Sequence, residues 1–563
     1  MLISLSDRCR LWVQRASRPR RRKGSQCRTP AVESLEVRLL LTGHNLPPAT
    51  VVVDVAHDVT ATDGFTTFRE GVQWANANFG SDVLRFSLPV GTQINLTQPY
   101  PVQILDDLTI DGPGQSTLSI HGGPYYDILH VGSGITVTIQ DITLISSGYG
   151  TIESDADLLT ITDSTIRINP QVTVASDSNI VNRLGDLTIE RTWIEGIGNN
   201  TISQGGGIYH TGGGALKITD GSTIHHHNSG VAGGGIYNDR SKVWIDHSTI
   251  SANSTTSSID LATGGPFQWP FEEPCDPASG DLEANGAGSG GGLYNHGGQV
   301  EIFHSSFTDN RAYFEGGALY SEGVAGTNSG IATVDIETTT MACNRVAFGY
   351  GGAISNVPGT GVSLLDLGVN PQSNPLTGFS VFERNVAEEG GGAIFNSSML
   401  GLFNSTISNN RARGKAPMTQ GNGGGLYLGV GGSSEIAFVT FAKNEANADG
   451  GGLFVEPTAS GPVKLTHSLF TVSNSAGTAG TDDIADLAGR IAYYCVNHLR
   501  DPVVDQLDFH GGVTRTHKLP PGHPAVNNIC WNPLRDQREF YRTDNVPDIG
   551  SFELGAAVGP HIF

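Results

Sequence analysis

The sequence predicts an all-β protein whose body is one right-handed parallel β-helix, a solenoid with short capping segments, and three patterns lead to this fold class. A glycine cluster followed by an apolar residue recurs along the chain, at about 26–28 residues in its shortest spacings. An apolar residue followed three positions later by asparagine precedes many of these clusters, and short alternating strands lie upstream. A coil of this size cannot cover its own apolar face, so it must stack on copies of itself.

The glycine clusters predict tight corners, because glycine adopts positive φ and lets neighbouring backbones approach closely. They are Gly205–Tyr209, Gly233–Asn238, Gly290–Asn295, Gly316–Tyr320, Gly351–Ser355, Gly390–Asn396, Gly423–Leu428 and Gly450–Phe454. The asparagines predict a second corner, since an asparagine amide can bond to the same residue of the next coil. They end the segments Ile250–Asn253, Phe307–Asn310, Met341–Asn344, Phe382–Asn385, Ile407–Asn410 and Phe441–Asn444. The competing solenoid, a leucine-rich repeat, needs an LxxLxLxxN pattern that is absent.

Aligning the strands on their apolar residues places seven residues of mixed type at one offset, and we expect them to share a corner. They are Asp163, Arg191, His247, His304, Thr338, Asn404 and His467. This column is either a polar groove for sugar or metal or a row of solvent-facing turns, and the second interpretation is favoured. The run His225–His227 occupies the asparagine-type turn of its coil, which invites adventitious metal binding but predicts no dedicated metal site.

The charge balance disfavours nucleic acid as a partner, because Lys and Arg total 33 against 55 Asp and Glu. No run of about 18 apolar residues occurs, so we expect no transmembrane helix and no insertion into a membrane. The six cysteines show no CxxC spacing, which argues against a metal site. If the protein is exported, Cys495 and Cys530 are the pair to consider for a disulfide, and two unpaired buried thiols are the alternative.

We divide the chain into four parts. Residues 1–43 are strongly basic and lack an apolar period, so we expect a targeting or disordered segment rather than a domain. The resemblance of Glu33–Leu41 given below makes it an expected export leader that is disordered or removed. We expect residues 44–107 to form the N-terminal cap and entry segment, residues 108–490 the coils, and residues 491–563 the C-terminal end of the β-helix and the closing module.

Candidate ligand-binding residues lie in two columns. Tyrosines follow the glycine clusters at Tyr209, Tyr237, Tyr294 and Tyr320, where they either bind sugar rings or pack beside the core. His247 and His304 belong to the mixed corner and are the second candidate for carbohydrate contact. Acidic pairs along the chain do not align with a lysine or arginine of a neighbouring coil, so we assign no catalytic residues, no metal ligands and no cofactor.

Four stretches resemble known families. The repeats from Gly205 to Phe454 resemble those of chlamydial polymorphic outer-membrane proteins. Segments Thr67–Asn76 and Asp82–Phe86 resemble the opening of bacterial extracellular β-helix proteins. The closing module resembles theirs at Gly512–His517, Pro521–Ala525, Asp536–Arg538, Arg542 and Asp548–Glu553. Residues Glu33–Leu41 resemble the LExRxLL export leader of planctomycete proteins, with Val37 where proline is usual.

These patterns favour a non-catalytic secreted or cell-surface protein with an adhesin-like or envelope structural role. The expected location is extracellular, at the cell surface or associated with an outer membrane, and the expected partners are polysaccharide or envelope components. The alternative is a polysaccharide-active lyase or glycosidase, with the insertion Thr255–Ser289 arching over a groove near His247 and His304.

Overall fold

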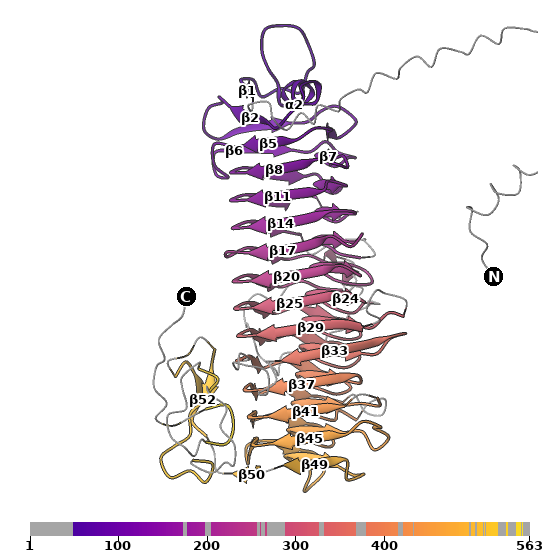
Figure 1. Ribbon diagram of the computed structural model, residues 1–563, viewed down its shortest axis with the longest axis vertical. Coiled ribbons are helices and arrows are strands. Elements are labelled where there is room, and N and C mark those ends of the chain that lie inside the picture. Colours follow the sequence, from indigo (N-terminus) through magenta and orange to yellow (C-terminus); the bar gives the residue numbers. More distant parts are fainter. Residues whose placement is uncertain are drawn as a thin grey trace, which may run out of the picture. The chain divides into compact units, whose positions relative to one another are not determined.

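The computed structural model describes residues 49–172, 177–197, 204–255, 259–260, 265–266, 288–325, 331–367, 379–414, 420–431, 433–494, 497–501, 504–510, 512, 514–526, 536–538, 548–552 and 554. These residues form a right-handed parallel β-helix, as expected. Each coil passes through a first, a second and a third sheet before it returns to the first, and the coils stack in register (Figure 1). The leader (residues 1–43), Cys495 and Cys530 lie outside the described residues.

The first sheet has 15 strands. They are β1 (Thr50–Val53), β2 (Asp82–Phe86), β5 (Leu108–Asp111), β8 (Thr136–Gln140), β11 (Leu158–Thr162), β14 (Asp186–Glu190), β17 (Ala215–Thr219), β20 (Lys242–Asp246), β25 (Gln299–Phe303), β29 (Ile331–Glu337), β33 (Val362–Leu367), β37 (Met399–Phe403), β41 (Ser434–Ala437), β45 (Val463–Thr466) and β49 (Ile491–Tyr494).

The second sheet has 14 strands. They are β3 (Thr92–Asn95), β6 (Leu118–His121), β9 (Thr143–Ser146), β12 (Thr165–Ile168), β15 (Trp193–Glu195), β18 (Thr223–His225), β21 (Thr249–Ser251), β26 (Ser306–Thr308), β30 (Thr340–Ala342), β34 (Val381–Glu383), β38 (Thr406–Ser408), β42 (Thr440–Ala442), β46 (Leu469–Thr471) and β50 (His498–Asp501).

The third sheet has 13 strands. They are β4 (Val102–Ile104), β7 (Leu129–Val131), β10 (Ile152–Ser154), β13 (Ile180–Asn182), β16 (Ile208–His210), β19 (Ile236–Asp239), β24 (Leu293–His296), β28 (Leu319–Glu322), β32 (Ile354–Val357), β36 (Ile394–Asn396), β40 (Leu426–Leu428), β44 (Leu453–Val455) and β48 (Ile484–Asp486).

Three smaller sheets complete the described strands. Six two-residue strands pair in parallel between the second and third sheets: β27 (Arg311–Ala312), β31 (Arg345–Val346), β35 (Val386–Ala387), β39 (Arg411–Ala412), β43 (Glu445–Ala446) and β47 (Ser475–Ala476). Two antiparallel pairs are β22 (Ile259–Asp260) with β23 (Gly265–Pro266), and β51 (Leu507–Asp508) with β52 (Thr516–His517).

One continuous core runs through the coils, because identical positions of successive strands point inward. In the third sheet Ile208, Ile236, Leu293 and Leu319 pair in register and are fully buried. In each cluster, the glycine that follows the positive-φ glycine is required for steric reasons: a Cβ on Gly392, for example, would lie 2.2 Å from the backbone oxygen of Gly424 in the next coil. The glycine repeat therefore follows from close backbone contact between coils.

A buried asparagine ladder forms the second corner, as expected from the sequence. Asn253, Asn310, Asn344, Asn385, Asn410, Asn444 and Asn474 each lie one coil below the last, and each Nδ2 donates to the next Oδ1 at 3.0–3.2 Å. Each Nδ2 also donates to a backbone carbonyl of the preceding coil. His227 takes the ladder position one coil above Asn253. The ladder satisfies amides that would otherwise be costly to bury.

The mixed column does share a corner, between the first and second sheets. Its seven residues all have φ between 45° and 50°, and Asp141, Asp220 and Phe438 adopt the same left-handed conformation. Such a conformation costs a residue other than glycine about 1 kcal/mol or more. A hydroxyl that follows the corner residue offsets this cost. Ser305, for example, donates to the carbonyl of Phe303 and accepts from the N–H of Ser248.

The helix α2 (Phe68–Ala77) packs beside β1, β2 and β4 at the first coils. Thr67 and Glu70 form a capping box at its start. Arg69 pairs with Asp58 at 2.8 Å, and both side chains are buried. Burial opposes ionisation of Asp58, but hydrogen bonds from Arg69, Gln98 and Thr97 hold its pKa below the ordinary value.

The C-terminal segment, residues 504–554 as far as they are described, packs on the outer face of the second sheet from β34 onward (Figure 1, yellow). Ser551 bonds the hydroxyls of Thr406 and Thr440 at 2.9 and 3.0 Å, and His517 bonds Ser408 at 2.8 Å. A small apolar cluster joins it to the sheet: Ala442, Leu469, Val504, Leu519, Ala525, Ile549 and Phe552.

Candidate functional site

The earlier strands of the second sheet carry a column of outward-facing polar side chains. Parallel register aligns Ser119, Thr143, Thr165, Trp193, Thr223, Thr249, Ser306 and Thr340 in successive coils. Trp193 is 53% exposed, while Thr406 and Thr440, in the same column under the C-terminal segment, are buried. The same column is therefore open in its first part and covered in its second.

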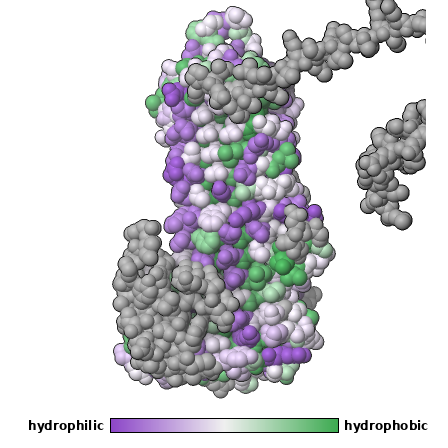
Figure 2. Space-filling model, in the orientation of Figure 1, coloured by the Kyte–Doolittle hydropathy of each residue, from purple (hydrophilic) through white to green (hydrophobic). Residues whose placement is uncertain are grey.

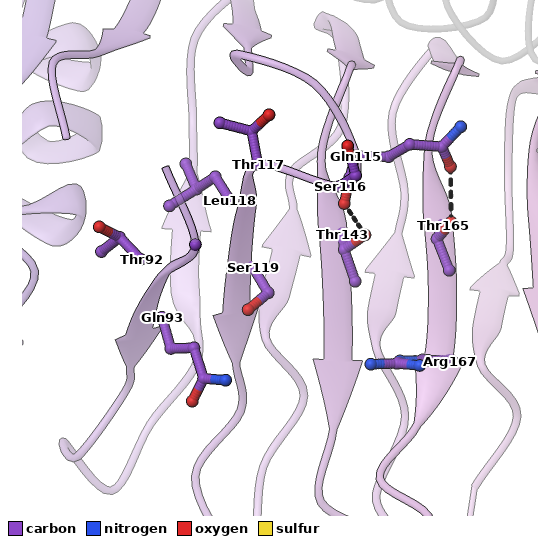
Figure 3. A pocket seen from close by; sticks show the side chains of 11 residues that line it. Thr92, Gln93, Gln115, Ser116, Thr117, Leu118, Ser119, Thr143, Thr165 and Arg167 are labelled. Atoms are coloured by element: carbon purple, nitrogen blue, oxygen red, sulfur yellow. Dashed lines mark hydrogen bonds between the residues drawn. The ribbon is translucent and has the colours of Figure 1, made fainter. Parts of the chain in front are cut away.

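A hollow of about 330 Å³ lies at the open end of this column (Figure 3). Gln115 spans two coils, since its backbone oxygen accepts from Thr143 at 2.7 Å and its side-chain oxygen accepts from Thr165 at 2.6 Å. Ser119 and Arg167 also line the hollow, and Arg167 Nε finds no hydrogen-bond partner among the described residues. The hollow thus offers hydroxyl, amide and guanidinium groups to a polar ligand.

Beside Trp193, the run His225–His227 occupies one corner, where His225 and His227 are buried and His226 is half-buried. His227 is fully buried in the ladder, whereas His225 and His226 approach each other with their Nδ1 atoms 2.6 Å apart. Trp193 Nε1 donates to His225 Nε2. Burial, followed by the neighbouring His226, lowers the pKa of His225 to about 4. Glu195, in register with His225, brings a carboxylate to the same corner.

The four candidate tyrosines form one stack on the outer side of the third sheet. Neighbouring rings lie 4.8–5.4 Å apart, and those of Tyr209 and Tyr237 are nearly parallel. Tyr294 donates to Glu322 at 2.7 Å, and burial together with this carboxylate raises the pKa of Tyr294. The ring faces cover one another, so hydroxyls and ring edges remain for a ligand.

His247 and His304 stack at the mixed corner with ring centroids 4.6 Å apart. Both Nδ1 atoms lie near Asp246 Oδ1, at 2.8 and 3.1 Å. This corner joins the first and second sheets, whereas the tyrosines belong to the third, so the structure does not bring the two sets together. Of the insertion expected to arch over these histidines, only Thr255, β22, β23, Gly288 and Ser289 belong to the described residues.

A second hollow, of about 300 Å³, opens on the first sheet and was missed by the sequence analysis. Gly401 forms its floor, with Asp366 in the coil before and Glu435 in the coil after, in one register column. Burial, then Asp335 and Glu337, raises the pKa of Asp366 to about 7. The search for acidic pairs along the chain could not find carboxylates that meet across coils. Figure 2 shows one face of the coils, where hydrophilic and hydrophobic residues are intermixed.

The segment that contains β34, β35 and β36 carries both repeat motifs, Phe382–Asn385 and Gly390–Asn396, in their ladder and corner positions. Residues 379–397 match the Chlamydia polymorphic membrane protein repeat. This match confirms the resemblance of the repeats that the sequence suggested.

A comparison with solved structures also found a similarity. The crystal structure of pectate lyase Pel9A shares 10% sequence identity over 90% of this chain and 97% of that chain, with a TM-score of 0.25. No curated protein matches the sequence. Among the described residues, no helix has the length and apolar character that a membrane span requires.

Proposed function

We propose that the protein is a non-catalytic β-helix of the cell surface or the extracellular space, with an adhesive role towards polysaccharide. The match to a repeat of a membrane protein family supports surface association. Cys343 is disulfide-bonded, which supports an oxidising location outside the cytosol. The net charge of −22 argues against nucleic acid as the partner.

The observation that carries the proposal is the open hydroxyl column of the second sheet. Its members repeat about every 4.8 Å, the distance between neighbouring strands. A polysaccharide carries hydroxyl groups on successive sugar rings, which suits a row of side chains that can each donate and accept hydrogen bonds. Trp193 adds an exposed aromatic ring on which a sugar can stack, and the hollow near Arg167 gives the chain an anchoring point.

In the covered part of the column, the C-terminal segment bonds to these positions through hydroxyl and amide groups. Thr406 and Thr440 bond the hydroxyl of Ser551, and Thr406 also bonds the side-chain oxygen of Gln537. Hydroxyl and amide groups are the groups that sugars present. The C-terminal segment thus supplies, within the chain, a pattern of contacts that a glycan would repeat on Thr165 and Thr223.

The tyrosine stack and the two stacked histidines form part of the same proposal. Tyr209, Tyr237, Tyr294 and Tyr320 would contact sugar through their hydroxyls and ring edges. His247 and His304 would do so through their exposed imidazole edges, on a different side of the coils.

Binding to immobilised neutral and uronic-acid polysaccharides tests the proposal. We expect Trp193→Ala to weaken binding at least about fivefold, because aromatic stacking and its burial contribute about 1 kcal/mol or more. Trp74→Ala is the matched control, since Trp74 is also exposed but lies on α2. Absence of binding to every polymer, or equal binding by the Trp193 variant, would refute the assignment.

One observation favours a second function, a glycosidase. Asp366 and Glu435 face one hollow across Gly401, two strand spacings apart, or about 9.6 Å between backbones. A carboxyl group with a pKa of about 7 can protonate a leaving oxygen while a second carboxylate activates water. Polysaccharide hydrolysis that Asp366→Asn abolishes, with binding retained, would replace the non-catalytic proposal with this one.

A further inference from the structure

Three potential metal ligands meet at the corner beside Trp193. Glu195 ends β15, His225 ends β18, and His226 follows at the turn. One ligand atom from each lies within 4.8 Å of the other two. The three residues come from two adjacent coils, so the β-helix itself sets their positions.

The tautomers of this cluster follow from its contacts. Trp193 Nε1 can only donate, so His225 Nε2 accepts and His225 carries its proton on Nδ1. That proton bridges to Nδ1 of His226 over 2.6 Å. One proton therefore lies between the Nδ1 atoms of His225 and His226, and a metal ion could replace it.

The backbone places His226 there at some expense. His226 has φ 57°, and the equivalent turn position holds Ala252, Asp309, Cys343, Arg384, Asn409 and Lys443 in other coils. Asn409, with φ 58°, shows that asparagine fits this turn in the same chain. The coil therefore imposes this turn conformation on residues of several types, so the turn does not require a histidine at position 226.

We propose that Glu195, His225 and His226 bind a divalent transition-metal ion, with Zn²⁺ as the representative case. Two imidazoles and one carboxylate are a donor set that suits Zn²⁺ better than Ca²⁺ or Mg²⁺. Two nitrogens bound to one tetrahedral Zn²⁺ lie about 3.3 Å apart, so the Nδ1 atoms separate by less than about 1 Å on binding.

Metal binding changes the indole contact. An ion on His225 Nδ1 moves the proton of that ring to Nε2, where it opposes the N–H of Trp193. The indole must then turn away, which its exposure permits. The fluorescence of Trp193 consequently reports whether the ion has bound.

A second cluster of histidine and carboxylate groups consists of Asp246, His247 and His304. Asp246 already holds both Nδ1 atoms of His247 and His304, and these side chains are 63% and 44% exposed. The contacts of that cluster are complete without an ion, and water competes for the remaining nitrogens. His304→Ala is therefore the matched control.

The test titrates the full chain with Zn²⁺ alone, by calorimetry and by tryptophan fluorescence. We expect one binding event that His226→Asn weakens at least about 100-fold, since loss of a direct ligand costs more than loss of an outer-shell partner. Glu195→Gln weakens it less, and His304→Ala leaves it unchanged. Trp193→Phe keeps the heat of binding and loses the fluorescence change.

Other outcomes overturn the inference. They are absence of Zn²⁺ binding by the wild-type chain, equal affinity in His226→Asn, or loss of binding in His304→Ala. A fluorescence change that persists in Trp193→Phe would remove His225 Nδ1 from the ligand set. Because no polysaccharide enters the experiment, its result is independent of the adhesive function.

Discussion

Replacement of one ladder asparagine should destabilise the coil more than any surface change. The Asn385 side chain makes four hydrogen bonds, donating to Met341 and Asn410 and accepting twice from Asn344, at 2.9–3.0 Å. It is fully buried. At about 1 kcal/mol net for each bond, Asn385→Ala should lower the free energy of unfolding by about 4 kcal/mol. Part of this loss in free energy arises because the backbone N–H of Asn344 remains buried without its acceptor, the Asn385 Oδ1.

Urea unfolding followed by circular dichroism measures the total loss, and hydrogen exchange locates it. A solenoid is coupled mainly between neighbours, so exchange should rise in the coils of β34, β38 and β30 and remain low near β8. Asn95→Ala is the control, because the Asn95 side chain is exposed on β3, and it should change stability by less than about 0.5 kcal/mol.

Equal stability of the two variants would refute the view that the ladder stabilises the fold. An Asn385→Ala variant that loses stability evenly over all coils would refute the nearest-neighbour picture instead.

Three further predictions concern other parts of the chain. Gly392→Ala should reduce the thermal unfolding temperature by several degrees or prevent folding, because its Cβ would overlap the backbone of Gly424 and Arg411; wild-type melting would contradict this. Burial lowers the pKa of His517 from 6.5 to about 4, so the docked C-terminal segment binds fewer protons than the released one between these pH values. The stabilisation that neutral His517 gives to docking is therefore fully present above pH 6.5. It decreases by on the order of 3 kcal/mol as the pH falls to 4. Proteolysis of the C-terminal segment should accelerate over this range, and an unchanged rate would count against it. Removal of residues 1–43 should leave the β-sheet circular dichroism intact, since the sheets begin at Thr50; its loss would show that the leader is needed for folding.

The regular parts of the fold were predictable because the same short motifs recur in successive coils, even where the coils differ in length. Asn310 and Asn344 each follow an apolar residue by three positions, so their contact could be predicted from this offset. The corner that holds Arg191 and Thr338 was found in the same way. Phe438 also occupies that corner, but the sequence did not predict it because its side chain is apolar. The turn constrains the backbone conformation and not the type of side chain.

The contacts between distant segments could not be predicted. Thr406 and Ser551 are 145 residues apart and bond through hydroxyls that carry no sequence signature. The candidate sites had the same difficulty, since Asp366 and Glu435 meet only through the register of the first sheet. The sequence drew attention to His225 and His226 as a run, but it could not show that Glu195 completes the group.

The register of the coils does not depend on the length of the connections between the strands. Asn182 reaches His210 after 28 residues, yet Asn238 reaches Asn295 after 57 with the same side-chain contact between coils. Evolution can therefore lengthen one corner without disturbing the strands on either side. The same tolerance makes the connection after Thr255 a natural acceptor for foreign peptides, so that the protein could serve as a display scaffold with inserts at a fixed height along the stack.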